Sequence, residues 1–290
     1  TAASIISEND QGNPIVLSNI VSSQVDIHKK FGGVVPELAA RSHIEKIDWI
    51  VQKAIDDSGI NINELDAVAS TSGPGLIVCL SIGLSFGKAL ASSLKKPFIA
   101  VNHLEGHALS PKLNSELNYP YLLLLISGGH TQYLCVKNLS KYKRLGTTID
   151  DAIGEAFDKT AKILGVEFPG GPQIEILAKK GDSYKYDLPK PIYNKGGCNL
   201  SFAGLKTAVL KIAKEIKTDQ EKFDLAASFQ RTVIEILHKK TKNAFAEFEK
   251  QIKMKEKKFV VAGGVAANKE IRSMLDNLCR KENYKPIFPP

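Results

Sequence analysis

Residues 121–149 read YLLLLISGGHTQYLCVKNLSKYKRLGTTI and predict three consecutive strands, the first two joined by a Gly-Gly turn. A helical sequence, DDAIGEAFDKTAKILG, follows, beginning near Asp150 and stopping at Gly165. Beyond it we predict a helix from about Glu221 to Glu249, a strand at 258–264, a helix from about Asn268 and a final strand near 285–290. Three strands followed by alternating helices and strands are typical of an α/β domain with a mixed sheet.

The residues before this stretch repeat the same order of elements. Strands are predicted at 2–6 and 14–23, a helix from Glu37 to Ser58, a strand at 66–71, a helix from Leu76 to Leu94 and a strand at 97–103. We therefore expect two duplicated α/β domains, residues 1–108 and 109–290, with a cleft between them and ligands at the strand ends. The second domain carries an irregular, glycine-rich insertion near 172–219.

The composition is that of an ordinary globular protein, with 43% hydrophobic and 24% charged residues among 290. The four cysteines form no Cys-x-x-Cys pair, which favours reduced thiols in a cytoplasm-like compartment. The net charge of +8 fits either a basic soluble protein or one with a polyanionic partner such as RNA. The lysine-rich run from Lys239 to Lys258 leaves this choice open, because three glutamates interrupt it as on a solvated helix face. We see no apolar run long enough to cross a membrane.

Four glycine-rich turns fall at the ends of predicted strands or helices: SGPGL (72–76), SGGH (127–130), PGGP (169–172) and GGVAAN (263–268). The turn at Gly128 and Gly129 is either a tight hairpin that needs φ > 0 or a cradle whose bare backbone N–H groups approach a phosphate. In the second case Ser127 and Thr131 could add hydroxyl donors. Several such turns together favour a nucleotide site, although none matches the P-loop or the dinucleotide fingerprint.

Two acidic positions near these turns could bind a ribose. Asp158 lies three residues after Glu155 on one helix face, and its carboxylate could accept hydrogen bonds from ribose hydroxyls. Glu175 could do the same. The alternative is an exposed helix face with an ordinary Glu155–Lys159 ion pair.

Residues 102–107 read NHLEGH and place His103 and His107 one helical turn apart on a shared face. This is not a zincin motif, because Leu104 rather than the general-base glutamate follows the first histidine. A two-histidine metal site would need a third ligand, usually a carboxylate. The alternative is a pair of histidines on a helix surface.

The motifs NHLEGH, SGGHTQ, GEAFDKTAK, PGGP and GGVAAN, in this order, resemble those of the tRNA N6-adenosine threonylcarbamoyltransferases, once described as O-sialoglycoprotein endopeptidases. The segments FGGVVPELAAR, SGPGL, SFAGLKTA and ASFQ also fit, so the resemblance covers essentially the whole chain. GGVVPE resembles the bacterial and organellar branch. The resemblance implies the actin-like ATPase fold of sugar kinases and heat-shock chaperones, with two duplicated α/β domains.

The resemblance also implies a set of site residues. His103 and His107 are expected to ligate one divalent metal ion per chain, Fe2+ in preference to Zn2+, with a third ligand, an aspartate, beyond Pro290. A first strand is expected before Thr1. The expected adenylate site comprises Ile126, Ser127, Gly128, Gly129, His130, Asp158, Gly171, Glu175 and Asn268.

The implied activity transfers a threonylcarbamoyl group from threonylcarbamoyl-adenylate to the N6 amine of adenosine 37 in tRNAs that read codons beginning with A, with release of AMP. No residue is assigned as a catalytic base. The implied partners are tRNA, a paralogous dimerisation subunit of the same fold and a small ATPase, with a homodimer as the alternative and no membrane. The implied location is the bacterial cytoplasm, with an organellar matrix as the alternative.

Two other functions remain open. A non-catalytic dimerisation paralogue of the same fold would not need His103, His107, Asp158 and Asn268. A kinase or ATP-driven chaperone of the actin-like class would lack the two-histidine helix.

Overall fold

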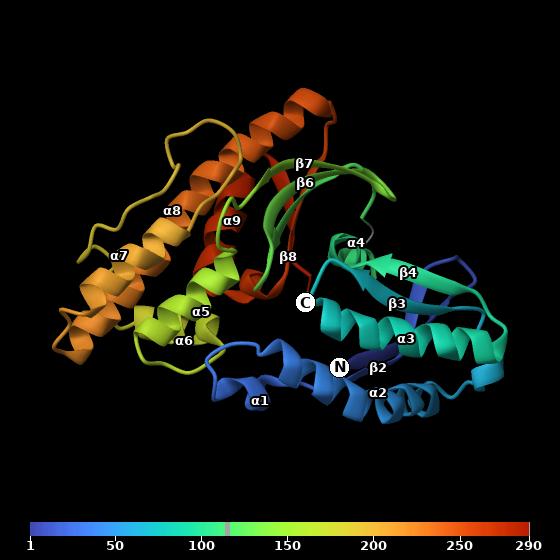
Figure 1. Ribbon diagram of the computed structural model, residues 1–290. Helices are drawn as coiled ribbons and strands as arrows, with labels where there is room; N and C mark the ends of the chain where they lie inside the picture. The colour runs from blue at the N-terminus through green and yellow to red at the C-terminus, as the bar shows by residue number, and fades with distance from the viewer. Residues whose placement is uncertain (114–116, 290) are drawn as a thin grey trace. The chain divides into compact units, whose positions relative to one another are not determined.

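The computed structural model describes residues 1–113 and 117–289 (Figure 1). The chain divides into two compact units, unit 1 (Thr1–Ser115) and unit 2 (Glu116–Pro290), where the sequence placed the boundary after residue 108. Both units are built from β-strands and α-helices, which confirms the predicted α/β class.

Unit 1 contains one antiparallel and one parallel pair of strands. β1 (Ala2–Glu8) and β2 (Pro14–Val21) form the predicted antiparallel hairpin. β3 (Val68–Gly73) and β4 (Phe98–Asn102) pair in parallel, so both end at the same edge. The helices and 3-10 turns of the unit are α1 (Val25–Lys29), α2 (Pro36–Ser58), the turn Ile62–Glu64, α3 (Ile77–Leu94), α4 (His103–Leu109) and the turn Ser110–Leu113.

The two long helices of unit 1 lie where the sequence predicted them. α2 packs on the β1–β2 hairpin, and α3 packs on β3 and on α2. α2 starts with Pro36, whose fixed φ suits the first helical position, and it ends at Gly59, whose φ of 74° is in the left-handed region that favours glycine.

α3 contradicts the prediction that no apolar run of the chain is long enough to cross a membrane. It spans 18 residues with a mean hydropathy of 1.6, so by length and composition it could cross a membrane. The sequence prediction that no apolar run is long enough is therefore wrong, because glycines, serines and alanines lengthen the apolar run and only Lys88 charges it. One such helix is weak support for a membrane span, since a helix of a soluble protein passes the same test.

Unit 2 is organised around one five-stranded mixed sheet in the order β7-β6-β5-β8-β9. Its strands are β5 (Tyr121–Ile126), β6 (Thr131–Asn138), β7 (Lys141–Thr147), β8 (Lys257–Ala262) and β9 (Tyr284–Ile287). β5 pairs antiparallel with β6 and parallel with β8, and all six of its side chains are buried. A central strand covered on both faces needs an unbroken apolar run, which YLLLLI supplies.

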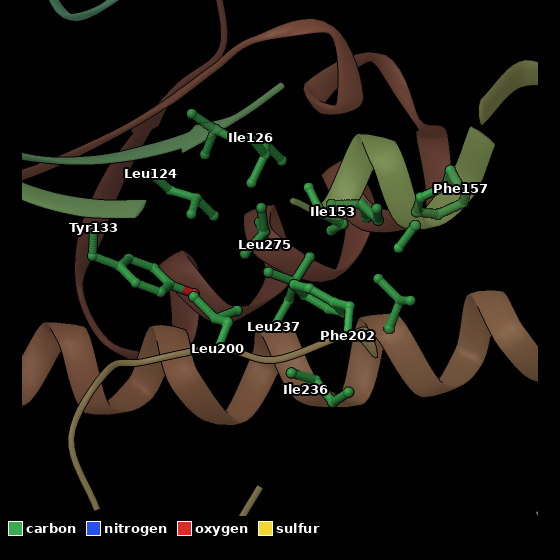
Figure 2. Close-up of a cluster of buried hydrophobic side chains, with 14 of the residues drawn as sticks. Leu124, Ile126, Tyr133, Ile153, Phe157, Leu200, Phe202, Ile236, Leu237 and Leu275 are labelled. Carbon is green, nitrogen blue, oxygen red and sulfur yellow. The ribbon is translucent and has the colours of Figure 1, made fainter. Parts of the chain in front are cut away.

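The helices of unit 2 complete its core. They are α5 (Ile153–Ile163), α6 (Gly170–Ala178), α7 (Ala203–Ala213), α8 (Asp219–Gln251), the 3-10 turn Gly264–Ala267 and α9 (Lys269–Lys281). In Figure 1, α8 and α9 lie along the same side of the sheet. Figure 2 shows side chains from β5, β6, α5 and α8 converging in one buried cluster, among them Leu124, Tyr133, Phe157 and Leu237. The Tyr133 hydroxyl, fully buried there, is hydrogen bonded to Thr241 Oγ1 at 2.8 Å.

The insertion near 172–219 is less irregular than the sequence predicted. α6 begins inside the PGGP turn at Gly170, and α7 begins at Ala203, the third residue of SFAGLKTA. The prediction of an irregular stretch was wrong at both places. α5 also starts at Ile153 rather than near Asp150.

Candidate functional site

The two histidines of unit 1 lie in the first and last turns of a short helix, α4, which follows β4. Asn102 Oδ1 accepts hydrogen bonds from the backbone N–H of Leu104 at 2.9 Å and of Glu105 at 3.2 Å, so it caps α4. This cap fixes where His103 and His107 emerge. Their ring centroids are 4.7 Å apart with planes at 83°, and both side chains are half-buried.

The SGPGL turn lies beside this histidine pair. In the parallel register Gly73 is the partner of Asn102, so the loop after β3 and the start of α4 share one edge. Two sequence motifs separated by about thirty residues are thereby brought together within unit 1.

The histidine pair fits part of a metal site. Two imidazoles one helical turn apart and 4.7 Å between centroids can reach one ion, since a metal–nitrogen bond is about 2 Å long. Across residues 1–113 and 117–289, no group of three or more His, Cys, Asp or Glu side chains could hold a metal. The described residues therefore bring no cluster of three such donors together around the histidine pair.

The Ser127–His130 turn of unit 2 is the predicted hairpin, and its glycines also leave open space. Ser127 N–H donates to His130 O at 2.8 Å, and His130 N–H donates to Ser127 Oγ at 3.1 Å. Both Gly128 and Gly129 are exposed, and a Cβ added at either would meet no atom within 4 Å. The φ > 0 expected for them is not observed, because the loop between paired residues Ile126 and Thr131 has four residues rather than two.

Two other glycines let neighbouring elements approach this turn. A Cβ at Gly154, in the first turn of α5, would lie 2.6 Å from Ser127 O and 2.7 Å from Gly128 Cα. At Gly263, which follows β8 with φ of 103°, it would lie 2.4 Å from Ile126 O. The N-terminal end of α5 and the carboxyl ends of β5 and β8 therefore meet at the turn. The side chain of Ile126 itself points into the core, so any contact with a ligand would use its backbone (Figure 2).

The carboxylates predicted to bind ribose lie on the two adjoining helices, α5 and α6. Asp158 Oδ1 accepts a hydrogen bond from Gly170 N–H at 2.8 Å, which holds the start of α6 against α5. Burial raises the pKa of the Asp158 carboxyl, against the lowering effect of that hydrogen bond. Glu175 is 14% exposed and lies 3.8 Å from Lys179 Nζ. A Cβ at Gly171 would meet no atom within 4 Å, so the first turn of α6 is open there.

Asn268 has a structural role in unit 2. Its Oδ1 accepts from Ile271 N–H at 3.0 Å and caps α9, while its Nδ2 donates to Gln230 Oε1 at 3.0 Å. The side chain is buried, and both of its polar atoms are engaged. The structure thus places Asn268 where it positions α9.

Two aspartates that sequence reasoning missed organise the start of α5. Asp150 accepts hydrogen bonds from the N–H groups of Phe202 and Ala203 and from the Ser201 hydroxyl. Asp151 pairs with Lys159 at 2.9 Å and Lys206 at 3.2 Å. The predicted Glu155–Lys159 pair is confirmed at 2.6 Å. The SFAGLKTA motif was a signal for this contact, because it contains both Ser201 and Lys206.

The family profile and the named relatives that match this chain agree on one family. A profile of the family described as tRNA N6-adenosine threonylcarbamoyltransferase matches residues 15–290. A protein of that name from Pelagibacter ubique is 76% identical over 290 residues, which are 100% of this chain and 81% of that protein. One from Brucella suis is 50% identical over 293 residues, covering 100% of this chain and 82% of the relative.

Two solved structures resemble the fold at low sequence identity. HypF of T. kodakarensis superposes with a TM-score of 0.61 at 14% identity, over 84% of this chain and 41% of that one. Component A of the (R)-2-hydroxyglutaryl-CoA dehydratase from Acidaminococcus fermentans superposes with a TM-score of 0.51 at 13% identity, over 100% of this chain and 88% of that one. These similarities agree with the predicted actin-like ATPase fold and show the fold alone.

Proposed function

Because this chain belongs to the tRNA N6-adenosine threonylcarbamoyltransferase family, it is a tRNA-modifying transferase, and we propose roles for its two groups of site residues. In this proposal unit 2 binds the adenylate donor, threonylcarbamoyl-adenylate, and His103 and His107 of unit 1 bind a divalent metal ion. The acceptor is the N6 amine of adenosine 37. Neither the dimerisation paralogue nor the kinase is favoured, because the named relatives are transferases.

The main observation that supports the proposed donor site is the open turn at Gly128 and Gly129. Its glycines are exposed and face no protein atom where side chains would be, so a phosphate can approach the backbone there. The first turn of α5 adds N–H groups and the positive end of a helix dipole beside the same turn. Asp158 and Glu175 would accept hydrogen bonds from the ribose hydroxyls, and Gly171 leaves room for the nucleoside.

The proposed reaction is an acyl transfer. The N6 nitrogen attacks the carbamoyl carbon, a carbon–nitrogen bond forms, and the bond from that carbon to the phosphate oxygen breaks. AMP leaves with the bonding electron pair, and N6 gives up one proton. Because AMP is a good leaving group, the step needs less help from a strong base. Negative charge develops on the carbamoyl oxygen, and donors aimed at that oxygen would stabilise the transition state.

The metal proposal rests on the histidine geometry of unit 1. His103 and His107 would hold the ion, Fe2+ in preference to Zn2+, through one nitrogen of each ring. A bound divalent ion supplies a Lewis acid for developing negative charge. The Asn102 side chain caps α4 through hydrogen bonds that involve neither histidine side chain, which supports a preorganised pair of ligands.

We extend the proposal to partners and location. The expected partners are tRNA, a paralogous dimerisation subunit of the same fold and a small ATPase, with a homodimer as the alternative. The named relatives are bacterial proteins, which supports a bacterial cytoplasmic location over an organellar matrix.

Gly129→Val in the full-length protein tests the donor site. The added side chain would occupy the space proposed for the phosphate, so calorimetry should show at least about tenfold weaker binding of a non-hydrolysable threonylcarbamoyl-adenylate analogue. Gly196→Val is the matched control, because Gly196 also faces open space without a positive φ and lies in the loop between α6 and α7. Equal affinity in a folded Gly129 variant would remove the turn from the site.

A further inference from the structure

The loop 181–198, between α6 and α7, has no regular secondary structure and is nevertheless held along α8 over several helical turns. Asp182 N–H donates to Asp224 Oδ1 at 2.8 Å, and Tyr186 N–H donates to Ser228 Oγ at 3.2 Å. Further along, side chains of α8 donate to backbone carbonyls of the loop: Lys240 Nζ to Lys195 O and Asn243 Nδ2 to Gly197 O, both at 2.8 Å. The loop therefore presents its side chains from fixed positions.

Tyr184 stands out in this loop because the residue is 77% exposed. The Arg231 guanidinium of α8 lies over the ring, 4.6 Å from its centroid. Arg231 is itself held by Tyr186 O at 3.3 Å and by Glu235 at 3.6 Å. Tyr184 N–H donates to Asp182 Oδ1 at 2.8 Å, which fixes the backbone under the ring. One aromatic face is thus backed by a cation, while most of the residue's surface is exposed.

A second contact between a cation and a tyrosine ring lies further along the loop. Lys190 lies 5.8 Å from the centroid of Tyr193 and is paired with Glu235, the same carboxylate that holds Arg231. Residues 179–195 contain five lysines against two aspartates. Aromatic rings interleaved with cations on a rigid, basic segment are what unpaired nucleic-acid bases and their phosphates bind.

We propose that Tyr184 is a stacking platform for an unpaired base of the tRNA substrate, with the loop lysines contacting the adjoining phosphates. The proposal rests on the proposed function, which makes tRNA the acceptor. Singly exposed tyrosines are ordinary on protein surfaces, but one that is held through its backbone and backed by a largely buried guanidinium loses little freedom when it binds. The excess of lysine favours RNA over a protein partner.

The test measures tRNA binding by the full-length protein with three substitutions at Tyr184. Tyr184→Leu removes the ring and should weaken tRNA binding about 5- to 150-fold. Tyr184→Phe and Tyr184→Trp keep an aromatic face and should stay within about threefold of the parent. Trp49→Leu, which removes the ring of a 46% exposed residue of α2, is the matched control and should bind tRNA normally.

A second readout follows the contact directly. With Trp49→Leu as background, Tyr184→Trp gives the described chain a single tryptophan, whose fluorescence should change on adding an anticodon stem-loop and not on adding the adenylate analogue. Wild-type tRNA affinity for Tyr184→Leu, or tryptophan fluorescence of the Tyr184→Trp variant that does not respond to RNA, would overturn the platform while leaving the proposed function intact. Failure of the proposed function would look different, because the parent protein itself would then neither bind nor modify tRNA.

Discussion

Asp158 and Asn268 both use their side chains to start a helix, and this limits what each can offer a ligand. Asp158 caps α6 through Oδ1, so its second carboxylate oxygen remains for a ribose hydroxyl. Asn268 engages its carbonyl oxygen with α9 and its amide with Gln230. Of the two, Asp158 is the better candidate for direct contact with the proposed donor, whereas Asn268 holds the start of α9.

For His103 and His107, replacement of both by alanine in the full-length protein separates metal binding from structural support. Truncating half-buried histidines should change stability by less than about 1 kcal/mol, so the melting temperature should move little. Loss of the ion should remove metal from elemental analysis and lower the yield of modified nucleoside about 100-fold or more.

His238→Ala is the matched control for that experiment, since His238 is an exposed histidine on α8. It should leave metal content, yield and melting temperature unchanged. Near-normal yield from the double alanine variant would leave α4 as a scaffold, and an unfolded variant would assign both histidines to the core.

At the scale of elements, α6 and α7 show why local sequence signals failed in the insertion. PGGP reads as a turn, yet Gly170 and Gly171 open α6 and Pro172 lies in its first turn, where a backbone N–H has no helical partner to lose. Gly170 is needed because a Cβ there would lie 2.7 Å from Asp158 Cα. At the start of α7, the backbone N–H groups of Phe202 and Ala203 donate to Asp150, which lies more than fifty residues earlier in the chain. The sequence next to α7 therefore contains no capping residue that could predict where the helix begins. The long helices and strands were predictable because their periodicity is local.

The tie between α5 and α7 should depend on pH through Asp151. Burial raises the pKa of this carboxyl, but hydrogen bonds and charges from Lys159 and Lys206 outweigh burial and hold the pKa below its usual value. A depressed folded-state pKa contributes stability that is fully present above the unfolded-state pKa of about 3.9 and is lost as pH falls through the folded value. Asp151→Asn should therefore cost about 1–3 kcal/mol at pH 7, and the difference should shrink as pH falls below about 4.

Urea unfolding of both proteins between pH 7 and pH 3 measures this effect. The control is Asp57→Asn, which breaks the exposed Lys53–Asp57 pair of α2, 3.3 Å long, and should change stability by less than about 1 kcal/mol at any of these pH values. A constant difference for Asp151→Asn across the range would assign its effect to packing rather than to charge.

At the scale of the whole molecule, both units have an α/β architecture, but they differ in how many of their strand residues are buried. The sequence predicted duplicated α/β domains, and unit 2 has the predicted mixed sheet with a fully buried central strand. Among the described residues of unit 1 the strands form two separate two-stranded sheets, and no residue of β1 is buried. The sequence could not predict this difference, because the alternation in β1 and β2 fits an edge pair or part of a larger sheet equally well.

This difference in burial predicts which strands of the 290-residue chain unfold locally first. The large buried cluster draws its members from unit 2, so amides of β5, β6 and β8 should exchange with solvent only on global unfolding. Amides of β1 and β2 lie in a two-stranded hairpin, which is marginal by itself, and should exchange at least about 100-fold faster at pH 7. Hydrogen exchange read by mass spectrometry compares peptides covering 1–21 with peptides covering 121–138. Equal protection of the two would mean that the units unfold as one cooperative body, and the burial of β5 would then give it no separate stability.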